Sequence, residues 1–316
     1  MVSPEEKISV VIPTWRGRSH LEALLPGIAT QSLRPLEVLI VDGNSADGTE
    51  EVAAQNGARL INLGQNLGFA VAVNRGINEA KADRIAVLNN DLRLAPNWLE
   101  KLAVVDAPFA VGKVLDWERP DYVDATWDLL SQSGIPMRVG HGKRDGAFWN
   151  QTREIALAPW TAILLRRDYW QATGGLDEKF ESYLEDIDIG MRGLKLGFRG
   201  RFEPGAVAWH RGSSTLGAWH PRQVRLSSRN QLRLLAKHGC TNWWKAIVGQ
   251  GLWGVAAARH GCFADWLRGK WEGARSFDEA AMKDNAVAVA DLEAEIFAVS
   301  SATGMDRFWQ LYWALS

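Results

Sequence analysis

The chain has 316 residues, 47% of them hydrophobic and 23% charged, and its formal net charge is −1. This length is enough for one large domain or two modest ones, and the near-neutral charge gives no indication of a nucleic-acid partner. The charge is unevenly distributed, because residues 192–275 hold 15 Lys or Arg and only 3 Asp or Glu. Such a basic segment predicts an anionic surface as partner, either phospholipid or a lipid-linked phosphate.

Cysteine usage and the N-terminus predict a cytoplasmic protein. Cys240 and Cys262 are the only cysteines, so a disulfide framework and a CxxC metal motif are both excluded. The N-terminal run MVSPEEKISVV has no basic flank followed by an apolar core, and no signal peptide is expected. The longest uncharged stretch near the C-terminus, residues 246–258, is too short to cross a bilayer.

Strands and helices alternate over the first hundred residues. Continuous apolar runs predict buried strands at 8–13, 36–42, 58–63 and 84–91. Helical spacing predicts helices at 19–31, from residue 47 onward and at 68–80. This pattern is typical of βαβ units and a parallel sheet covered on both faces, and such sheets bind ligands beyond the carboxyl ends of their strands. Thr14, Asp42 and Asp91 stand at three such ends.

The pattern is looser in the middle of the chain. Residues 106–150 are rich in Gly, Asp and Trp and predict loops with an irregular hairpin. Strands are predicted at 154–165, 198–202 and 206–209. Beyond Pro221 the spacing indicates amphipathic helices. The predicted architecture is therefore an α/β domain over residues 1–220, with halves at about 1–105 and 106–220, and a helical extension over 221–316.

The decapeptide YLEDIDIGMR at 183–192 places Glu185, Asp186 and Asp188 within four positions. If the segment is helical, Glu185 and Asp188 share a face and Asp186 points elsewhere. Ionised carboxylates this close repel one another, so a metal, a substrate hydroxyl or a cationic partner is expected beside them. The alternative is a helix N-terminus whose acidic residues complement the helix dipole.

Six runs occur in the order seen in glycosyltransferase family 2. They are VVIPTW, VDGNSADGT, NLGFAVAVNRGI, VLNNDLRL, GGLDEKFESYLEDIDIGMR and VAWHRGSST. Over roughly residues 8–275 the chain resembles this family, in particular its rhamnosyltransferase-like branch for bacterial cell-surface polysaccharides. The resemblance implies a GT-A fold, with a Rossmann-like and mostly parallel central sheet, and an inverting enzyme with a nucleotide-sugar donor. Residues 1–105 would bind the donor and 106–220 the acceptor.

The resemblance assigns donor binding mainly to the first half. Asp42 would accept from the imide N–H of uracil or thymine, which cytosine lacks; the alternative is an aspartate that caps the next turn. Glycine at 68 would allow close backbone approach, and the helix start there would offer N–H groups to phosphate. The alternative at this point is a plain helix entry with a capping Asn. The implied donor-binding residues are Thr14, Asp42, Asn66, Gly68, Asn74 and Asn90.

The resemblance also implies a divalent metal. The run NND at 89–91 occupies the position of the family's acidic metal motif, with Asn89 in place of the usual first carboxylate. Asp91 and His210 are then the expected ligands of Mn²⁺ or Mg²⁺, shared with the donor phosphates. The imidazole favours Mn²⁺. The alternative for His210 is a purely structural role.

The family's general base aligns with Asp186. This carboxylate would take the proton of the acceptor hydroxyl as that hydroxyl attacks the anomeric carbon. Glu185 would help to place the hydroxyl, and Asp188 or Arg192 would brace the helix. The family usually has Gly followed by Ala where this chain has Thr161-Ala162, so the sugar preference is open to change; the branch itself favours rhamnose.

The C-terminal extension carries a basic stripe of Arg225, Arg229, Arg233 and Lys237, followed by Trp-rich helical segments. A helix with a cationic face and Trp and Leu opposite lies in the membrane interface. We therefore expect peripheral binding to the inner face of the cell membrane and a glycan or lipid-linked acceptor. The alternative is a packed helical subdomain with a solvated basic face. Residues 278–299 predict an acidic helix, and 308–315 an aromatic clip onto a core or a second subunit.

Two other functions stay open from the sequence. A nucleotidyltransferase would carry a Gly-rich loop with Arg and Lys after the first strand, and WRGRSH is a poor match to it. A non-catalytic, membrane-associated partner of a polysaccharide assembly complex is favoured by Asn89 alone. Asp91, Glu185, Asp186 and His210 favour an enzyme. The oligomeric state is not indicated.

Overall fold

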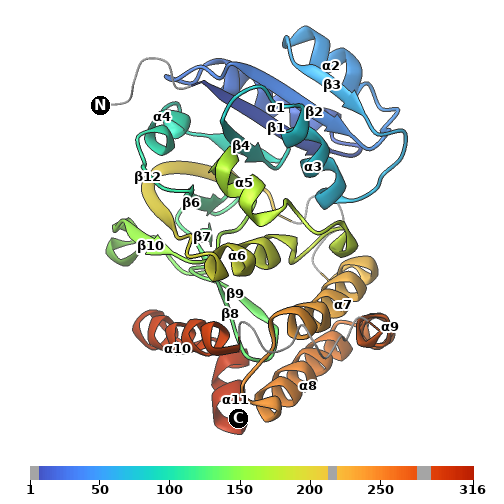
Figure 1. Ribbon diagram of the computed structural model, residues 1–316, viewed down its shortest axis with the longest axis vertical. Helices are drawn as coiled ribbons and strands as arrows, with labels where there is room; N and C mark the ends of the chain where they lie inside the picture. The colour runs from blue at the N-terminus through green and yellow to red at the C-terminus, as the bar shows by residue number, and fades with distance from the viewer. Residues whose placement is uncertain (1–6, 213–218, 276–285) are drawn as a thin grey trace.

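The computed structural model of the protein describes residues 7–212, 219–275 and 286–316. Within these residues the main sheet has ten strands (Figure 1). Eight of them lie in the order β10-β12-β6-β11-β4-β1-β2-β3, and the other two, β5 and β7, pair with β12 and β6. One end of this row of strands is parallel throughout, because β1 pairs with β2 and β4, and β2 pairs with β3. These strands are β1 (Ile8–Thr14), β2 (Glu37–Asp42), β3 (Arg59–Asn62) and β4 (Arg84–Leu88). The predicted strands of this half are confirmed.

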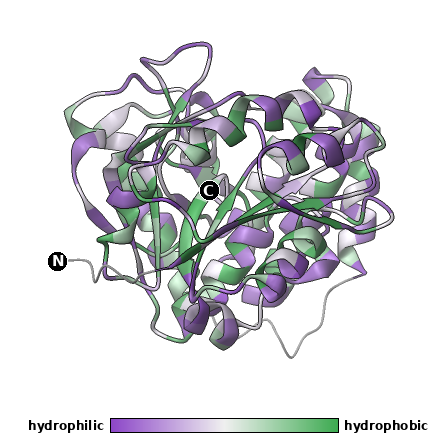
Figure 2. Cartoon of the chain, turned by 90° about the horizontal axis from the view of Figure 1, so that it is seen from above, coloured by the Kyte–Doolittle hydropathy of each residue, from purple (hydrophilic) through white to green (hydrophobic). Residues whose placement is uncertain are grey.

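Helices cover both faces of the parallel strands. They are α1 (Arg18–Ala29), α2 (Thr49–Gln55), α3 (Phe69–Glu79) and α4 (Trp98–Ala103). Alternate residues of β1 enter two different cores: Val10 and Ile12 pack with α1, α2 and α4, and Val11 packs with α3. Seen from above, the apolar strands run through the middle of the molecule (Figure 2). The predicted doubly covered α/β sheet is confirmed.

The second half of the sheet is mixed. Its strands are β5 (Leu92–Leu94), β6 (Phe109–Asp116), β7 (Val123–Ala125), β10 (Arg153–Ile155), β11 (Ala162–Arg166) and β12 (Gly200–His210). Strand β11 is antiparallel to both β4 and β6, whereas β6 and β12 are parallel. A separate hairpin is formed by β8 (Asp128–Leu130) and β9 (Pro136–Arg138). Helices α5 (Arg167–Thr173) and α6 (Glu185–Lys195) lie between β11 and β12 in the chain.

Three predictions for this half are wrong in detail. Strand β6 lies where loops were expected. The prediction missed it because Lys113 interrupts the apolar run; in the structure Lys113 is buried and pairs with Asp145 at 2.8 Å. The strand expected at 154–165 is two strands, β10 and β11. The two short strands expected at 198–202 and 206–209 are one strand, β12, with a register shift between Glu203 and Val207.

Five helices form the C-terminal extension in the described residues. They are α7 (Pro221–His238), α8 (Trp243–Arg259), α9 (Phe263–Ala274), α10 (Ala286–Thr303) and α11 (Arg307–Leu315). Helix α9 packs closely on α7 at Gly269 and Gly273, where an added Cβ would lie 2.2 Å and 2.6 Å from backbone oxygens of α7. Among the described helices, none has both the length and the apolar character needed to span a bilayer.

The end of the chain packs on its own domain. Trp309 and Tyr312 of α11 are buried, as the prediction of an aromatic clip onto a core requires. The carboxylate of Glu293 on α10 accepts from the backbone of Gln132 at 3.0 Å and from the Tyr312 hydroxyl at 2.5 Å, and so joins α10 and α11 to the β8–β9 turn. Residues 278–285 of the predicted acidic helix, and the SST of the VAWHRGSST run, lie outside the described residues.

Candidate active site

A cavity of about 840 Å³ opens at the carboxyl ends of β1, β4, β6 and β12. It is bordered on its other side by residues 182–187 and by the first turns of α7. Eight predicted site residues line it: Thr14, Asn66, Gly68, Asn90, Asp91, Glu185, Asp186 and His210. Asp42 and Asn74 are not among the lining residues. The expectation that ligands bind beyond the strand ends therefore agrees with the position of this cavity.

At the carboxyl ends of β1 and β4, Thr14 and Asn90 are held together. The Asn90 side-chain amide donates to the Thr14 hydroxyl at 2.8 Å. Asp42 is the register partner of Thr14 on the neighbouring strand. Its buried carboxylate accepts from the Ser45 backbone N–H at 2.9 Å and from the Ser45 hydroxyl. Asp42 therefore caps the next turn, which is the alternative role that the sequence left open.

The start of α3 is occupied by the protein itself. The backbone N–H of Phe69 donates to the Ser182 hydroxyl at 3.1 Å, and that of Ala70 donates to the Glu181 carbonyl at 2.9 Å. Both N–H groups therefore have partners within the protein, and their predicted use for phosphate stays a prediction. Gly68 has φ of +93°, and an added Cβ would lie 2.7 Å from the Glu181 carbonyl oxygen. Glycine is required there for contact with the segment before α6, and that segment borders the cavity.

Asn74 and Asn66 also bond to the protein. The Asn74 amide donates to the Leu176 carbonyl at 2.9 Å and accepts from the Leu176 N–H at 3.0 Å, outside the cavity. The predicted donor contact of Asn74 is not supported by this position, and its contacts give it a structural role. The Asn66 side chain accepts from the Gly68 N–H at 3.1 Å in the turn before α3, and α3 itself begins after Gly68 without a side-chain cap.

The two predicted metal ligands meet in the cavity. His210 Nε2 lies 3.2 Å from Asp91 Oδ1, and His210 Nδ1 lies 2.8 Å from Asp124 Oδ2. Burial lowers the pKa of His210, but hydrogen bonds to both carboxylates outweigh burial and raise it to about 9. Burial raises the pKa of Asp124, but hydrogen bonds from His141 and His210 bring it well below the usual range.

These residues fit a divalent cation in their chemistry. A metal-binding histidine commonly has a carboxylate on its other ring nitrogen, and Asp124 occupies that position for His210. Nε2 and the Asp91 carboxylate then face one another as an imidazole and an oxygen donor, a set that suits Mn²⁺. Within residues 7–212, 219–275 and 286–316, no group of three or more His, Cys, Asp or Glu is arranged to hold a metal by itself.

The acidic decapeptide divides its three carboxylates differently from the prediction. Glu185 and Asp186 line the cavity, whereas Asp188 faces α7 and is fully buried. Asp186 Oδ1 accepts from the Ile187 N–H at 2.9 Å, and its Oδ2 lies 3.5 Å from the Trp160 N–H. Glu185 Oε2 is buried and has no hydrogen-bond partner in the described part of the chain.

The environments of the two cavity carboxylates raise their pKa values. Burial, and then the charge of Asp186, raises the pKa of Glu185 well above its usual value. Burial also raises the pKa of Asp186. Because two adjacent carboxylates in a poorly solvated site do not both ionise easily, the pair holds a proton more readily than either group would in water. The two protons of the pair are therefore expected to leave in separate steps.

Four cavity residues from β7, β8, β9 and the loop after β9 were missed by the sequence analysis. They are Asp124, Asp128, Arg138 and His141. Asp128 is 3% exposed, and its Oδ1 lies 4.0 Å from Arg138 Nε. Burial raises the pKa of Asp128 to about 7 despite the opposing charge of Arg138. Their sequence pattern was available, because the run VDATWDLL places polar residues at every second position from Asp124 to Asp128.

The basic stripe of α7 faces the protein. Arg225 pairs with Glu272 of α9 at 2.8 Å, and the buried Arg229 pairs with Glu181 at 2.5 Å. Arg233 donates to the Lys179 carbonyl, and Lys237 pairs with Asp177 at 2.9 Å and with Asp188 at 3.0 Å. These contacts contradict the prediction that the four side chains form a lipid-facing surface. The four basic side chains contact the acidic segment 177–188 and α9 instead.

Sequence comparison relates the chain to sugar transferases. A family model described as glycosyl transferase family 2 matches residues 9–166. An N-acetylglucosaminyl-diphospho-decaprenol L-rhamnosyltransferase of Mycobacterium tuberculosis is 27% identical over 280 residues, which cover 80% of this chain and 91% of that protein. A pre-mycofactocin glycosyltransferase of the same organism is 29% identical over 69% of this chain, but only 45% of that protein is covered.

Solved structures share the fold. A structure of GalNAc-T7 with UDP, GalNAc and Mn²⁺ matches 96% of this chain with a TM-score of 0.65 and 14% identity. The chain spans 59% of that protein's length. A mannosyltransferase from Pyrobaculum calidifontis, in complex with GDP-Man and Mn²⁺, matches 99% of this chain and 88% of its own, with a TM-score of 0.53 and 15% identity. At such low identity the likeness concerns the fold alone.

Proposed function

Because this chain belongs to glycosyltransferase family 2, we propose that it transfers a sugar from a dTDP- or UDP-sugar to an acceptor hydroxyl, with inversion at the anomeric carbon. The family and its relatives make the chain a nucleotide-sugar glycosyltransferase. One observation carries the proposal: Asp186 lies in the same cavity as the Asp91–His210 pair, at the carboxyl ends of the parallel strands.

For the sugar and the acceptor, the proposal draws on the Mycobacterium tuberculosis relative that covers 80% of this chain. The Mycobacterium tuberculosis protein is named as an L-rhamnosyltransferase acting on N-acetylglucosaminyl-diphospho-decaprenol. We take rhamnose as the transferred sugar and a lipid-linked diphospho-sugar as the acceptor of this chain. Thr161 lines the cavity and is 4% exposed, so it limits the room available to the sugar ring.

Asp186 acts as the general base in this mechanism. Its Oδ1 is oriented by the Ile187 N–H, which leaves the rest of the carboxylate to accept the proton of the acceptor hydroxyl. Burial raises the pKa of Glu185 well above its usual value, so Glu185 retains its proton to higher pH than an ordinary glutamate and, while protonated, donates to an acceptor oxygen. A neutral Glu185 also allows Asp186 to remain ionised.

Asp91 and His210 would hold Mn²⁺ or Mg²⁺, with Asp124 orienting the imidazole through Nδ1. The bound cation would neutralise the charge that develops on the nucleoside diphosphate as it leaves. Thr14 and Asn90, which are bonded to one another at the same end of the cavity, would contact the nucleotide.

Calorimetry with dTDP-, UDP- and GDP-sugars tests the donor and the metal together. We expect a dTDP- or UDP-sugar to bind in the presence of Mn²⁺, and to bind at least about tenfold more weakly without Mn²⁺ or in His210→Ala. His141→Ala is the matched control, because His141 also contacts Asp124 but is not one of the two proposed metal ligands. Binding of GDP-sugars alone would contradict the proposed base preference. Failure of all donors to bind would favour the non-catalytic partner.

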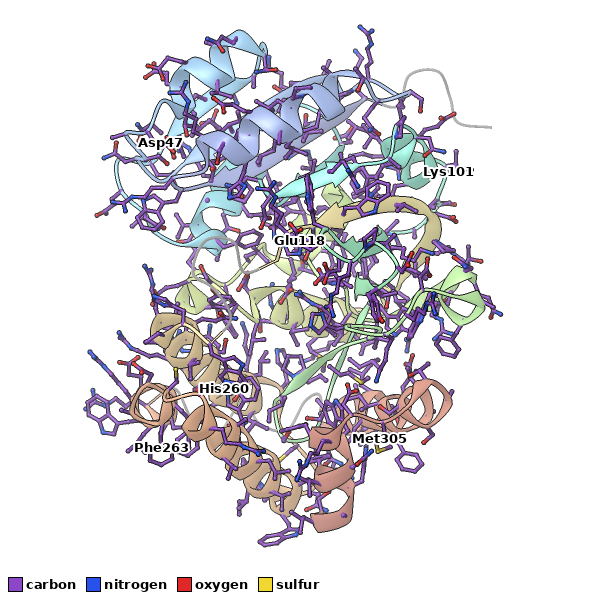
Figure 3. All side chains as sticks on the ribbon, turned by 180° about the vertical axis from the view of Figure 1, so that it is seen from behind. Asp47, Lys101, Glu118, His260, Phe263 and Met305 are labelled. Atoms are coloured by element: carbon purple, nitrogen blue, oxygen red, sulfur yellow. The ribbon has the colours of Figure 1, made fainter. Side chains whose placement is uncertain are left out.

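We also propose that the extension contacts the membrane through the exposed sides of α8 and α9, here called the apolar face. Its large side chains are between 45% and 62% exposed: Trp243, Trp244, Ile247, Val255, Phe263, Leu267 and Trp271. Arg259, Arg268 and Arg275 are exposed on the same two helices or at their ends. Figure 3 shows Phe263 and His260 at the α8–α9 end of the extension, on the opposite side from Met305. Apolar side chains with flanking arginines suit an anionic lipid interface.

Helix α8, which carries part of the apolar face, also reaches the cavity. Trp253 of α8 lines it together with Leu226 of α7. A lipid-linked acceptor held at the apolar face would therefore have its sugar close to Asp186.

Vesicle sedimentation tests the apolar face. Trp244→Glu/Leu267→Glu is expected to bind vesicles containing phosphatidylglycerol at least about tenfold more weakly than the unmodified protein. Two apolar side chains that would enter the lipid are replaced by negative charges, which the anionic lipid repels. Val104→Glu/Leu196→Glu is the control, since both side chains are more than half exposed but lie in the α/β domain. Equal vesicle binding by the two double variants would contradict the assignment.

A further inference from the structure

The residues directly before Asp186 form a backbone turn that is unfavourable for their side chains. Glu181, Tyr183 and Leu184 have φ values of 61°, 72° and 70°, although none of them is glycine. Residues other than glycine rarely adopt this left-handed backbone conformation, and they keep it only where surrounding contacts stabilise it. The turn over residues 181–184 is followed at once by the first residues of α6, Glu185 and Asp186. Its conformation therefore sets where these carboxylates point.

Asn230 of α7 binds this turn. The side chain is fully buried, and its Nδ2 lies 2.9 Å, 3.0 Å and 2.7 Å from the carbonyl oxygens of Phe180, Ser182 and Tyr183. Its Oδ1 accepts from Arg229 Nε at 3.0 Å, which fixes the direction of the amide. The two N–H bonds of one amide are thus shared among the backbone carbonyls of residues 180, 182 and 183. A carboxylate or an apolar side chain of similar size would supply neither of these donors.

Other contacts complete the grip on the turn. Arg229 Nη2 donates to the Phe180 carbonyl at 2.9 Å, on the α7 side. On the α3 side, the N–H groups of Phe69 and Ala70 donate to Ser182 and Glu181. The turn is therefore enclosed between a helix of the donor half and a helix of the C-terminal extension. Helix α7 contributes a fully buried side-chain amide to it.

We infer that Asn230 is a positioning residue for sugar transfer: its amide holds the 181–184 turn in the conformation that directs Glu185 and Asp186 into the cavity. Helix α7 is then part of the active site, although it belongs to the extension. This inference rests on the proposed role of Asp186 as general base.

Asn230→Asp tests the inference with little change in side-chain volume. Its carboxylate would face three carbonyl oxygens, so the turn loses its donors and gains repulsion. With dTDP-rhamnose, Mn²⁺ and a polyprenyl-diphospho-N-acetylglucosamine acceptor, we expect kcat to fall at least about 100-fold, while the Kd of the donor changes less than about threefold. Asn230→Ser retains one O–H donor and is expected to give an intermediate kcat.

Hydrogen–deuterium exchange gives a readout that needs no substrate. In Asn230→Asp, peptides that cover residues 180–187 are expected to exchange at least about tenfold faster, and peptides of β1 and β4 to be unchanged. Asn242→Ala is the matched control. Asn242 caps α8 by accepting from the Trp244 N–H at 3.0 Å, so its loss weakens the extension without contact to the turn. The control should keep both its kcat and the slow exchange of residues 180–187.

The outcomes separate this inference from the proposed function. Unchanged exchange at 180–187 in a folded Asn230→Asp protein would overturn the role of Asn230, and so would an equal increase along the whole chain. Faster exchange confined to 180–187 with unchanged kcat would also overturn it. A third outcome is faster exchange at 180–187 in Asn230→Asp while the unmodified protein transfers no sugar. It would support the stabilisation of the turn by Asn230 and contradict the proposed reaction.

Discussion

Asp186→Asn is expected to lower kcat for sugar transfer by about 10²–10⁴-fold. The substituted amide has the size of the carboxylate and keeps an oxygen for the Ile187 N–H, so the turn and α6 should be unaffected. What is lost is the ability to accept a proton from the acceptor hydroxyl. The donor Kd, measured by calorimetry, should change less than about threefold, because donor binding lies at the Thr14 and Asp91 end of the cavity.

The pH profile gives a second test of the same residue. Because burial raises the pKa of Asp186, kcat/KM should fall with decreasing pH through a value above that of an ordinary aspartate. Activity is present above this pKa, where the base is ionised, and is lost below it. Glu185→Gln is the control: it keeps Asp186, so kcat should fall less than in Asp186→Asn. Retained turnover in a folded Asp186→Asn protein would contradict the assignment.

Asp188→Asn is expected to lower the free energy of unfolding by about 3–5 kcal/mol. Asp188 is fully buried and accepts from His238 at 2.9 Å, from Lys237 at 3.0 Å and from Arg192 at 2.9 Å. A neutral amide removes the counter-charge of the partly buried Arg192 and Lys237. Urea unfolding followed by tryptophan fluorescence measures the loss, since the midpoint shifts while the slope is unchanged.

The sign of the pH dependence follows from the pKa of Asp188. Burial raises this pKa, but the hydrogen bond to His238 and the charge of Arg192 outweigh burial, and the pKa is well below its usual range. A carboxyl with a depressed folded-state pKa stabilises the protein above its unfolded-state pKa, and this stabilisation is lost as the pH falls through the folded-state value. The difference between the unmodified protein and Asp188→Asn should therefore be largest near neutral pH and shrink in acid.

Glu272→Gln is the matched control for Asp188→Asn. It also removes a carboxylate that pairs with two arginines, Arg225 and Arg268, but this cluster is nearer the surface. Its loss should cost less than about 1 kcal/mol, because solvent screens such pairs. Equal losses in the two variants would contradict a special role for the buried network between α6 and α7.

The first half of the fold could be predicted because its pattern is local. Each buried strand is a continuous apolar run, and each helix between them has its own spacing, so no distant partner is needed to recognise them. Strand β6 lacks this property. Lys113 lies within it and is buried only because Asp145, 32 residues later, supplies the opposite charge. A sequence pattern read locally has no means of finding such a partner.

The same limit applies to the site. The order of motifs placed Asp91, Asp186 and His210 in one cavity, but Asp124, which bonds His210 from 86 residues away, was missed. At α3 the residue types suited a phosphate, yet Ser182 and Glu181 already occupy the N–H groups. The spacing of the basic residues in α7 predicted the helix correctly. Their predicted partner was a lipid surface, but in the structure they contact the protein. The acidic segment 177–188, of opposite charge, was the available clue.

The hold of Asn230 on residues 180–183 has a consequence for how the protein is made. A ribosome completes the family-matched region at residue 166, then Asp186, and only later the helix that fixes the catalytic turn. Contacts between segments this far apart form slowly, because the intervening chain must first be closed into a loop. The growing chain therefore passes through a stage at which the donor half can fold while the turn is still unrestrained. On the proposed roles of Asp186 and Asn230, catalytic competence would be acquired late in biosynthesis, when α7 docks.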